Sequence, residues 1–218
     1  MPTQGALSTL NADSPEGRKA TELFRAAYDM VSLDERQAQT LNENKGLPAA
    51  LRRLIEEHSM PLKAPEGGYI RIVHVPVNPS REWQEAVSAA GPDTGKDWEI
   101  RIVADNYQPQ KGATEEREII LVNFGKSVTS QHVLDWAKLH GLFPEKARGM
   151  FAIGEHEPKL NFVLDMAYMA VVSLEECSFQ GARRVPALWW HETFREANLF
   201  WFLGSWGDNY WFAFSREP

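Results

Sequence analysis

Aromatic residues are concentrated at the C-terminal end of this chain. Eleven of its 24 aromatic residues lie between Trp189 and Phe214, and five of its eight tryptophans are among them. Aromatic side chains are favoured in β-strands, where they bury large apolar areas. The last forty residues show strand patterns and no helical period. A regular parallel sheet with alternating helices is therefore disfavoured.

Three strands of a meander are expected in this aromatic segment, at residues 185–191, 199–206 and 209–216. Gly207-Asp208 places glycine at the first central position of a two-residue turn, as a type II′ hairpin requires. In that register Trp206 pairs with Asn209 across the turn. Both faces of the meander are then aromatic, so neither face is a plain solvated surface.

The aromatic meander has three interpretations. In the first, its rings form the core of a sheet that is covered on both faces. In the second, an exposed aromatic face docks a protein partner, because Trp, Tyr and Arg are enriched at interaction hot spots. In the third, the rings stack on a sugar or on an unpaired base. Trp206, beside the turn, is the first candidate for an exposed ring, and the other candidate binding residues are Trp189, Trp190, Trp201, Tyr210 and Arg195.

The N-terminal part of the chain has the pattern of three helices, between residues 14 and 58. Ser14-Pro15 is typical of a helix start, and apolar residues follow at three- and four-residue spacing. Residues 59–67 are rich in proline and glycine, which indicates a linker. The sequence thus predicts a helical segment at residues 1–66 and an α+β domain at residues 67–218.

Strands and helices alternate in the middle of the chain. The run from Ile119 to Val122 is apolar without interruption, which is typical of a strand buried on both faces. The predicted fold class is α+β, with the N-terminal three-helix segment followed by a mixed, mostly antiparallel sheet with helices on one face and a C-terminal aromatic β-meander. The predicted strands are residues 69–77, 98–104 and 118–124, and the predicted helices are residues 81–90 and 130–155.

Charge and cysteine content argue against several classes of protein. The net charge is −7, whereas nucleic-acid binding needs a surplus of Lys and Arg on one face. A single cysteine cannot form an intrachain disulfide or a Cys-rich zinc site. The longest apolar stretch, residues 162–174, is interrupted by Asp165 and is too short to span a bilayer. With no secretory pattern at the N-terminus, we expect a cytoplasmic protein without a membrane partner.

The segment from Phe124 to Ser127 partly matches a phosphate-binding loop. It follows an apolar strand and contains Gly125-Lys126-Ser127, as such a loop does. The full loop also needs a glycine five residues before Gly125, where this chain has Ile120. The simpler interpretation is a strand end, a turn and a helix start. A weak anion site at Lys126 and Ser127 stays open, because amides at a helix N-terminus bind anions.

Several polar residues are weak candidates for catalysis. Glu155 and His156 could supply one or two metal ligands, but the spacing indicates no third ligand. His191 begins a zinc-protease pattern in which Arg195 stands where the second histidine belongs. Cys177 follows two carboxylates, which disfavour a reactive thiolate. No metal site is assigned, the cofactor is not identified, and the catalytic candidates are Glu155, His156, Cys177, His191 and Asp208.

Two functions are consistent with these features. The first is a non-enzymatic binding or interaction protein that uses the aromatic C-terminal sheet to hold a protein partner, a second copy of itself or a small ligand. The second is a small enzyme of the hydrolase class, whose polar residues converge only in three dimensions. The sequence does not decide between them, because residues that form a site are often far apart along the chain.

Overall fold

The computed structural model describes residues 62–96 and 98–216, together with the isolated positions Arg25, Asp34, Arg36, Gln37, Gln39 and Thr40. The chain divides into two units, Met1–Pro61 and Leu62–Pro218. The predicted three-helix segment at residues 14–58 lies outside the described residues, apart from those isolated positions. The second unit contains the sheet and the helices that position the candidate site.

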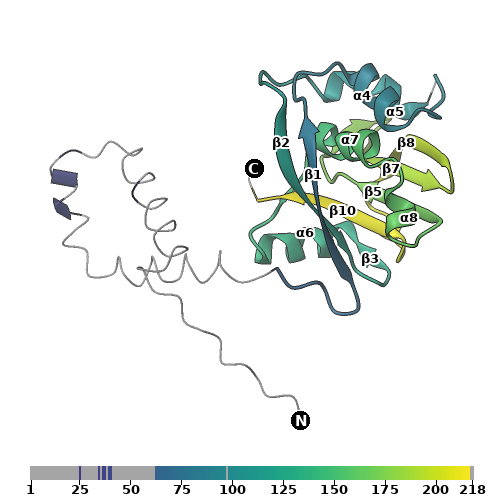
Figure 1. Cartoon of the computed structure of the whole chain (residues 1–218). Helices are drawn as coiled ribbons and strands as arrows, with labels where there is room; N and C mark the ends of the chain where they lie inside the picture. Colours follow the sequence, from purple (N-terminus) through teal and green to yellow (C-terminus); the bar gives the residue numbers. More distant parts are fainter. Residues whose placement is uncertain are drawn as a thin grey trace, which may run out of the picture. The chain divides into compact units, whose positions relative to one another are not determined.

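An eight-stranded mixed sheet forms the centre of the second unit (Figure 1). Its strands are β1 (Tyr69–Val77), β2 (Glu115–Asn123), β4 (Phe143–Pro144), β5 (Tyr168–Val172), β6 (Cys177–Phe179), β7 (Ala182–His191), β8 (Phe194–Trp201) and β10 (Tyr210–Ser215). They follow the order β1-β2-β10-β5-β7-β6, with β4 paired to β10 and β8 paired to β7. Within this sheet only the pairing of β10 with β5 is parallel. The predicted α+β class with a mixed, mostly antiparallel sheet is confirmed.

The strand β2 separates two apolar cores, one on each face of the sheet. Ile119 and Leu121 belong to the first core, and Ile120 and Val122 belong to the second. All four side chains are fully buried. Successive residues of a strand point to opposite faces, so an uninterrupted apolar run is what a strand covered on both faces needs. The sequence prediction for this strand is confirmed.

Helices cover both faces of the sheet, so the prediction of helices on one face only is wrong. The first core holds residues of α4 (Trp83–Ala90), α5 (Glu99–Ile102) and α7 (Ala147–His156), and the second holds residues of α6 (Ser130–Leu139). Figure 1 shows α6 apart from the other three helices. A further short helix is α8 (Leu160–Val163). In the described part of the chain, no helix has the length and apolar character that a membrane crossing needs.

The predicted strand at residues 98–104 is wrong, because this segment forms helical turns. Helix α5 is followed by a 3₁₀ turn, η1 (Ala104–Asn106). Ile100 and Val103 are buried, whereas Ile102 is exposed. The buried residues of this segment are therefore three positions apart, as in a helix, although the alternation of Ile100 and Ile102 is also typical of a strand.

The C-terminal segment is not the predicted meander. Strands β7 and β8 form an antiparallel hairpin, but β10 leaves them and lies between β2 and β5. Trp206 lies on β9 (Ser205–Trp206) and pairs with Val128 on β3 (Val128–Thr129), not with Asn209. The physical reason is that β10 is aromatic on both faces, with Trp211 in the first core and Phe212 in the second. A central position in the sheet buries both faces, which a terminal hairpin cannot do.

Helix α7 is held at its N-terminal end by two carboxylates. Glu145 is 1% exposed and accepts a hydrogen bond from Arg117 (Nη1 to Oε1, 3.1 Å). Glu175 accepts one from the backbone N–H of Ala147 (2.8 Å), where the helix dipole favours a negative charge. A Cβ atom at Gly149 would lie 2.1 Å from Glu145 Oε1, so a glycine inside the helix makes room for that side chain. These contacts fix the helix whose last turn carries Glu155 and His156.

Burial raises the pKa of the Glu145 carboxyl above its ordinary value of 4.5, and the attraction of Arg117 offsets only part of this effect. The second carboxyl oxygen, Oε2, has no hydrogen-bond partner among the described residues. The folded protein therefore binds a proton at Glu145 more tightly than the unfolded chain does. The resulting stabilisation is complete below the ordinary pKa and is lost as the pH rises through the raised pKa.

Replacing Glu145 by glutamine should remove this pH-dependent loss of stability. The melting temperature of Glu145→Gln, relative to wild type, should therefore rise between about pH 4 and pH 8. Thermal melts followed by circular dichroism over that range measure it. Glu116→Gln is the control, because it makes the same substitution at an exposed glutamate of β2. A difference between Glu145→Gln and wild type that stays constant with pH would contradict the expectation.

Candidate functional site

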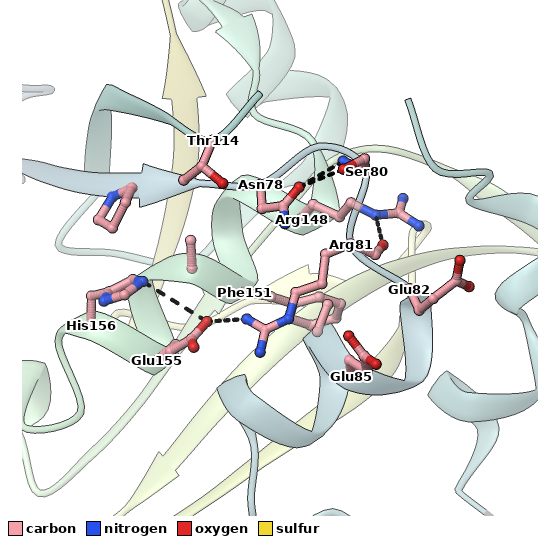
Figure 2. Close-up of a pocket in the computed structure, with 13 residues that line it drawn as sticks. Asn78, Ser80, Arg81, Glu82, Glu85, Thr114, Arg148, Phe151, Glu155 and His156 are labelled. Carbon is pink, nitrogen blue, oxygen red and sulfur yellow. Dashed lines mark hydrogen bonds and ion pairs between the residues drawn. The ribbon is translucent and has the colours of Figure 1, made fainter. Parts of the chain in front are cut away.

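A cleft of about 520 Å³ opens between the loop that follows β1 and the helices α4 and α7 (Figure 2). Its apolar lining residues are Pro76 on β1, Ala86 on α4, and Phe151 and Ala152 on α7. Most of its other lining residues are polar or charged. They are Asn78, Ser80, Arg81, Glu82, Glu85, Thr114, Arg148, Glu155 and His156. We call it the Arg81–Glu155 cleft.

An arginine and a glutamate from distant parts of the sequence meet in this cleft. Arg81 Nη1 forms an ion pair with Glu155 Oε2, and the two side chains are 29% and 31% exposed. His156 Nε2 lies 3.9 Å from the same glutamate oxygen. Figure 2 shows Arg81 reaching from the loop toward Glu155 on α7. The last turn of α7 thus presents a carboxylate that lies between a guanidinium group and an imidazole.

A compact turn sets the direction of Arg81. The side-chain oxygen of Asn78 accepts hydrogen bonds from the backbone N–H of Ser80 (3.0 Å) and from its hydroxyl (2.8 Å). Such a turn is typical of Asn followed by a polar residue two positions later. It ends β1 and brings the chain to α4 with Arg81 at the edge of the cleft. These two hydrogen bonds hold the turn in shape at the edge of the cleft.

Arg148 lies at the cleft but serves mainly to hold the structure together. Its guanidinium donates to the carbonyl oxygens of Arg81 (2.9 Å), Tyr107 (2.9 Å) and Gln108 (3.4 Å). It also lies 5.6 Å from the ring centre of Trp83. Burial lowers the pKa of Arg148 below its ordinary value. Arg148 therefore ties α7 to two loops, and it has little hydrogen-bonding capacity left for a ligand.

Of the five catalytic candidates, the structure brings only Glu155 and His156 together. His191 is exposed and lies edge-on to Tyr168 (ring centres 4.4 Å apart). Asp208 lines a second cleft of about 670 Å³. Cys177 is buried, and burial raises the pKa of its thiol. These three residues lie outside the lining of the Arg81–Glu155 cleft.

Two of the candidate aromatic residues are part of the core. Trp206 is 3% exposed and donates from Nε1 to the hydroxyl of Ser130 (2.8 Å). Trp190 is 1% exposed and donates from Nε1 to the carbonyl oxygen of Pro158 (3.2 Å). The expectation that Trp206 is an exposed ring is therefore wrong. Its ring fills the second core beside α6, because β9 turns inward to pair with β3.

Other aromatic candidates are at least partly accessible. Trp201 is 57% exposed, with the guanidinium of Arg184 3.5 Å from its ring centre. Trp189 and Tyr210 are half-buried, and each packs near Phe200, at 6.3 Å and 6.0 Å between ring centres. An accessible aromatic surface therefore exists on the C-terminal strands, but it is smaller than the sequence indicates.

Arg195 is engaged in structural hydrogen bonds, whereas Lys126 and Ser127 lie on the surface. Arg195 donates from Nε to the carbonyl oxygen of Ala90 and from its backbone N–H to Asp93 (2.7 Å). Burial lowers the pKa of Arg195. Lys126 and Ser127 are exposed, but α6 begins only at Ser130 and its N-cap is Thr129. The anion site at Lys126 and Ser127 stays a prediction.

The sequence reasoning missed Arg81 and Arg148. Arg81 and Glu155 are 74 positions apart in the sequence, and no motif connects them. The only local signal was the expected helix start near residue 81, which placed a loop before α4 without indicating what that loop faces. Glu155 and His156 were found because their polar run stands out at the end of an apolar helix.

Among the residues that the structure describes, no three His, Cys, Asp or Glu side chains come together in a way that could hold a metal ion. Comparisons with protein-family models, with curated proteins and with solved structures found no match to this chain.

Proposed function

We propose that this protein is a binding protein that holds a small polar ligand in the Arg81–Glu155 cleft. The observation that carries the proposal is the Arg81–Glu155 ion pair at an open cleft of about 520 Å³. That volume falls within the range of small-molecule sites, about 300–1,000 Å³. Few apolar side chains line the cleft, so a ligand that fits it has several groups able to form hydrogen bonds.

The Arg81–Glu155 ion pair contributes little to folding. Both side chains are about one-third exposed, and ion pairs of that kind contribute about 0–1 kcal/mol to stability. The pair can therefore rearrange around a ligand at low energetic cost. Because the pair adds so little to stability, its charged groups are available to bind a ligand.

Replacing Arg81 by alanine should abolish ligand binding and leave the fold intact. A panel of small polar molecules is screened by thermal melts of the full chain. A ligand at about a hundred times its dissociation constant adds about 2.7 kcal/mol to the unfolding free energy, which raises the melting temperature by several degrees. That rise should disappear in Arg81→Ala. The variant itself should lose no more than about 1 kcal/mol of stability, so its melting temperature without ligand should stay close to that of wild type.

The matched control is Arg183→Ala, which breaks another arginine–glutamate pair, with Glu176, outside the cleft. It should keep the ligand-induced rise. A ligand that stabilises Arg81→Ala as strongly as wild type would show that the cleft is not its site.

A hydrolase is the second candidate, because Glu155 and His156 share one cleft. A carboxylate and an imidazole within reach of a bound molecule can transfer protons. Incubation of a cleft ligand with the protein distinguishes the two functions. Consumption of the ligand by wild type but not by His156→Asn would make the protein an enzyme, whereas unchanged ligand in both supports binding alone.

The aromatic C-terminal strands are a second binding surface in this proposal, suited to a protein partner. The support is Trp201, which is 57% exposed and stacked on Arg184, a pair of residue types enriched at interaction hot spots. A protein partner or self-complex that is retained by wild type and lost in Trp201→Ala, measured by size-exclusion chromatography, would support it. Retention by the variant would remove this surface from consideration.

A further inference from the structure

The ion pair of the Arg81–Glu155 cleft leaves hydrogen-bonding capacity on both of its partners. Arg81 donates from Nη1 to Oε2 of Glu155 (Figure 2), and its Nε and Nη2 have no partner among the described residues. The second carboxyl oxygen of Glu155, Oε1, likewise accepts no hydrogen bond from the described part of the chain. A guanidinium group has several N–H donors, and each oxygen of a carboxylate accepts hydrogen bonds. Both groups can therefore bind a ligand without separating from each other.

The other guanidinium group of the cleft has no such capacity. Arg148 directs its three nitrogens at backbone carbonyl oxygens. A negatively charged group of a ligand therefore finds its donors on Arg81, where Nε and Nη2 lie on the same side of the guanidinium plane and can donate in parallel to the two oxygens of a carboxylate.

The position of Glu155 favours a positively charged group of a ligand. Glu155 lies in the last turn of α7, which ends at His156. The carbonyl groups at the C-terminus of a helix carry partial negative charge, which attracts cations. The carboxylate of Glu155 adds a negative charge at the same place. An ammonium group that contacts Glu155 is therefore stabilised by the carboxylate and by the helix terminus.

A ligand with charge of only one sign is disfavoured in this cleft. Carboxylates line it on Glu82, Glu85 and Glu155, and they would repel a ligand that is only negatively charged. A ligand that is only positively charged would lie beside the guanidinium of Arg81, which has the same sign. A ligand with one charge of each sign gains a contact with Arg81 and a contact with Glu155, and it leaves the net charge of the cleft unchanged.

We propose that the ligand of the Arg81–Glu155 cleft is a small zwitterion of the α-amino acid class. This inference rests on the proposed function and names the class of its ligand. The carboxylate of the ligand accepts hydrogen bonds from Nε and Nη2 of Arg81, and its ammonium group donates to Oε1 of Glu155. In an α-amino acid both charged groups are attached to one carbon atom, which suits two protein groups that are themselves in contact. Because the lining is mostly polar, amino acids with polar side chains should bind more tightly than apolar ones.

Thermal melts followed by isothermal titration calorimetry of the full chain test the proposal. The standard amino acids are each added alone, and the one that raises the melting temperature most is chosen for calorimetry. It is compared with its N-acetyl form, which lacks the ammonium group, and with its amide, which lacks the carboxylate. The free amino acid should bind at least about tenfold more tightly than either derivative, since each derivative loses one charged contact.

Two variants should each remove the preference for one of the two charges. Arg81→Ala should lose the affinity for the amino acid and no longer distinguish it from its amide, because the carboxylate has lost its partner. Glu155→Gln should weaken binding at least about tenfold and no longer distinguish the amino acid from its N-acetyl form. The matched controls are Arg183→Ala and Glu176→Gln, which change an ion pair outside the cleft and should bind as wild type does.

Four results would overturn the inference, and they separate it from the proposed function. If no amino acid binds but another polar molecule stabilises wild type and not Arg81→Ala, the cleft is a ligand site and only the zwitterionic class is wrong. The class is also wrong if either derivative binds wild type as tightly as the free amino acid does. If an amino acid binds wild type, Arg81→Ala and Glu155→Gln equally, its site lies elsewhere and the inference fails. If no polar molecule stabilises wild type, the inference and the proposed function fail together.

Discussion

Replacing Trp206 by alanine should lower the free energy of unfolding by about 3–5 kcal/mol, the usual cost of removing a large aromatic side chain from a core. The ring is 3% exposed and lies 5.1 Å from that of Tyr210 and 5.9 Å from that of Phe212, between ring centres. The change also leaves the buried hydroxyl of Ser130 without the indole donor. Thermal melts should show a decrease in melting temperature of about 6–20 °C.

Trp201→Ala is the matched control for this experiment. Its ring is 57% exposed, so the same truncation should cost about 1 kcal/mol or less. Equal losses of stability in the two variants would contradict the burial of Trp206 in the second core. A large loss for Trp206→Ala with a small loss for Trp201→Ala separates the structural tryptophan from the accessible one.

Replacing Gly125 by alanine should destabilise the protein by about 2–4 kcal/mol, since two independent costs add. Its φ angle is 63°, a left-handed conformation that side chains with a Cβ atom disfavour. A Cβ atom there would also lie 1.8 Å from the carbonyl oxygen of Gly67. The backbone of one of the two segments would have to move. Chemical denaturation of the full chain measures the loss.

Gly141→Ala provides the comparison, because Gly141 has nearly the same φ angle, 64°, but no atom within 4 Å of the position of an added Cβ atom. It should cost only the conformational part, about 1–2 kcal/mol. Equal costs for the two variants would mean that the contact with Gly67 is unimportant. A larger cost at Gly125 would mean that close packing against Gly67 requires a glycine at this position, so no phosphate-binding loop is needed to account for it.

Sequence patterns predicted the elements whose apolar spacing is unambiguous. The nine residues of β1 were found because alternate valines are buried, and β2 was found because its apolar run is continuous. Residues 98–104 were misread, because Trp98, Ile100 and Ile102 alternate as a strand does while the buried pair is Ile100 and Val103. A short segment can satisfy both periods, and only packing decides between them.

The arrangement of the C-terminal strands could not be read from local pattern. The turn at Gly207-Asp208 is compatible with a hairpin. Strand β10 instead lies between β2 and β5, where Trp211 and Phe212 are buried on opposite faces of the sheet. The partners of β10 lie far away in the sequence. Strand pairing of that kind depends on the whole sheet, so a correct list of strands does not give their order.

The sequence indicated some of the residues of the candidate site but not all of them. Glu155 and His156 were named, but a carboxylate and a histidine occur together on many helix ends. What distinguishes this pair is the ion pair of Glu155 with Arg81, which is 74 positions away in the sequence. Tertiary contacts of this length leave no spacing to detect in a single sequence.

The claim that the Arg81–Glu155 cleft holds a small ligand is tested most directly by native mass spectrometry. The full chain, purified gently and exposed to a metabolite extract, is compared with Arg81→Ala and with Arg183→Ala. We expect a discrete added mass on wild type and on Arg183→Ala and a bare chain for Arg81→Ala. A bare chain in all three samples, or the same added mass in all three, would contradict the assignment of the cleft as the functional site.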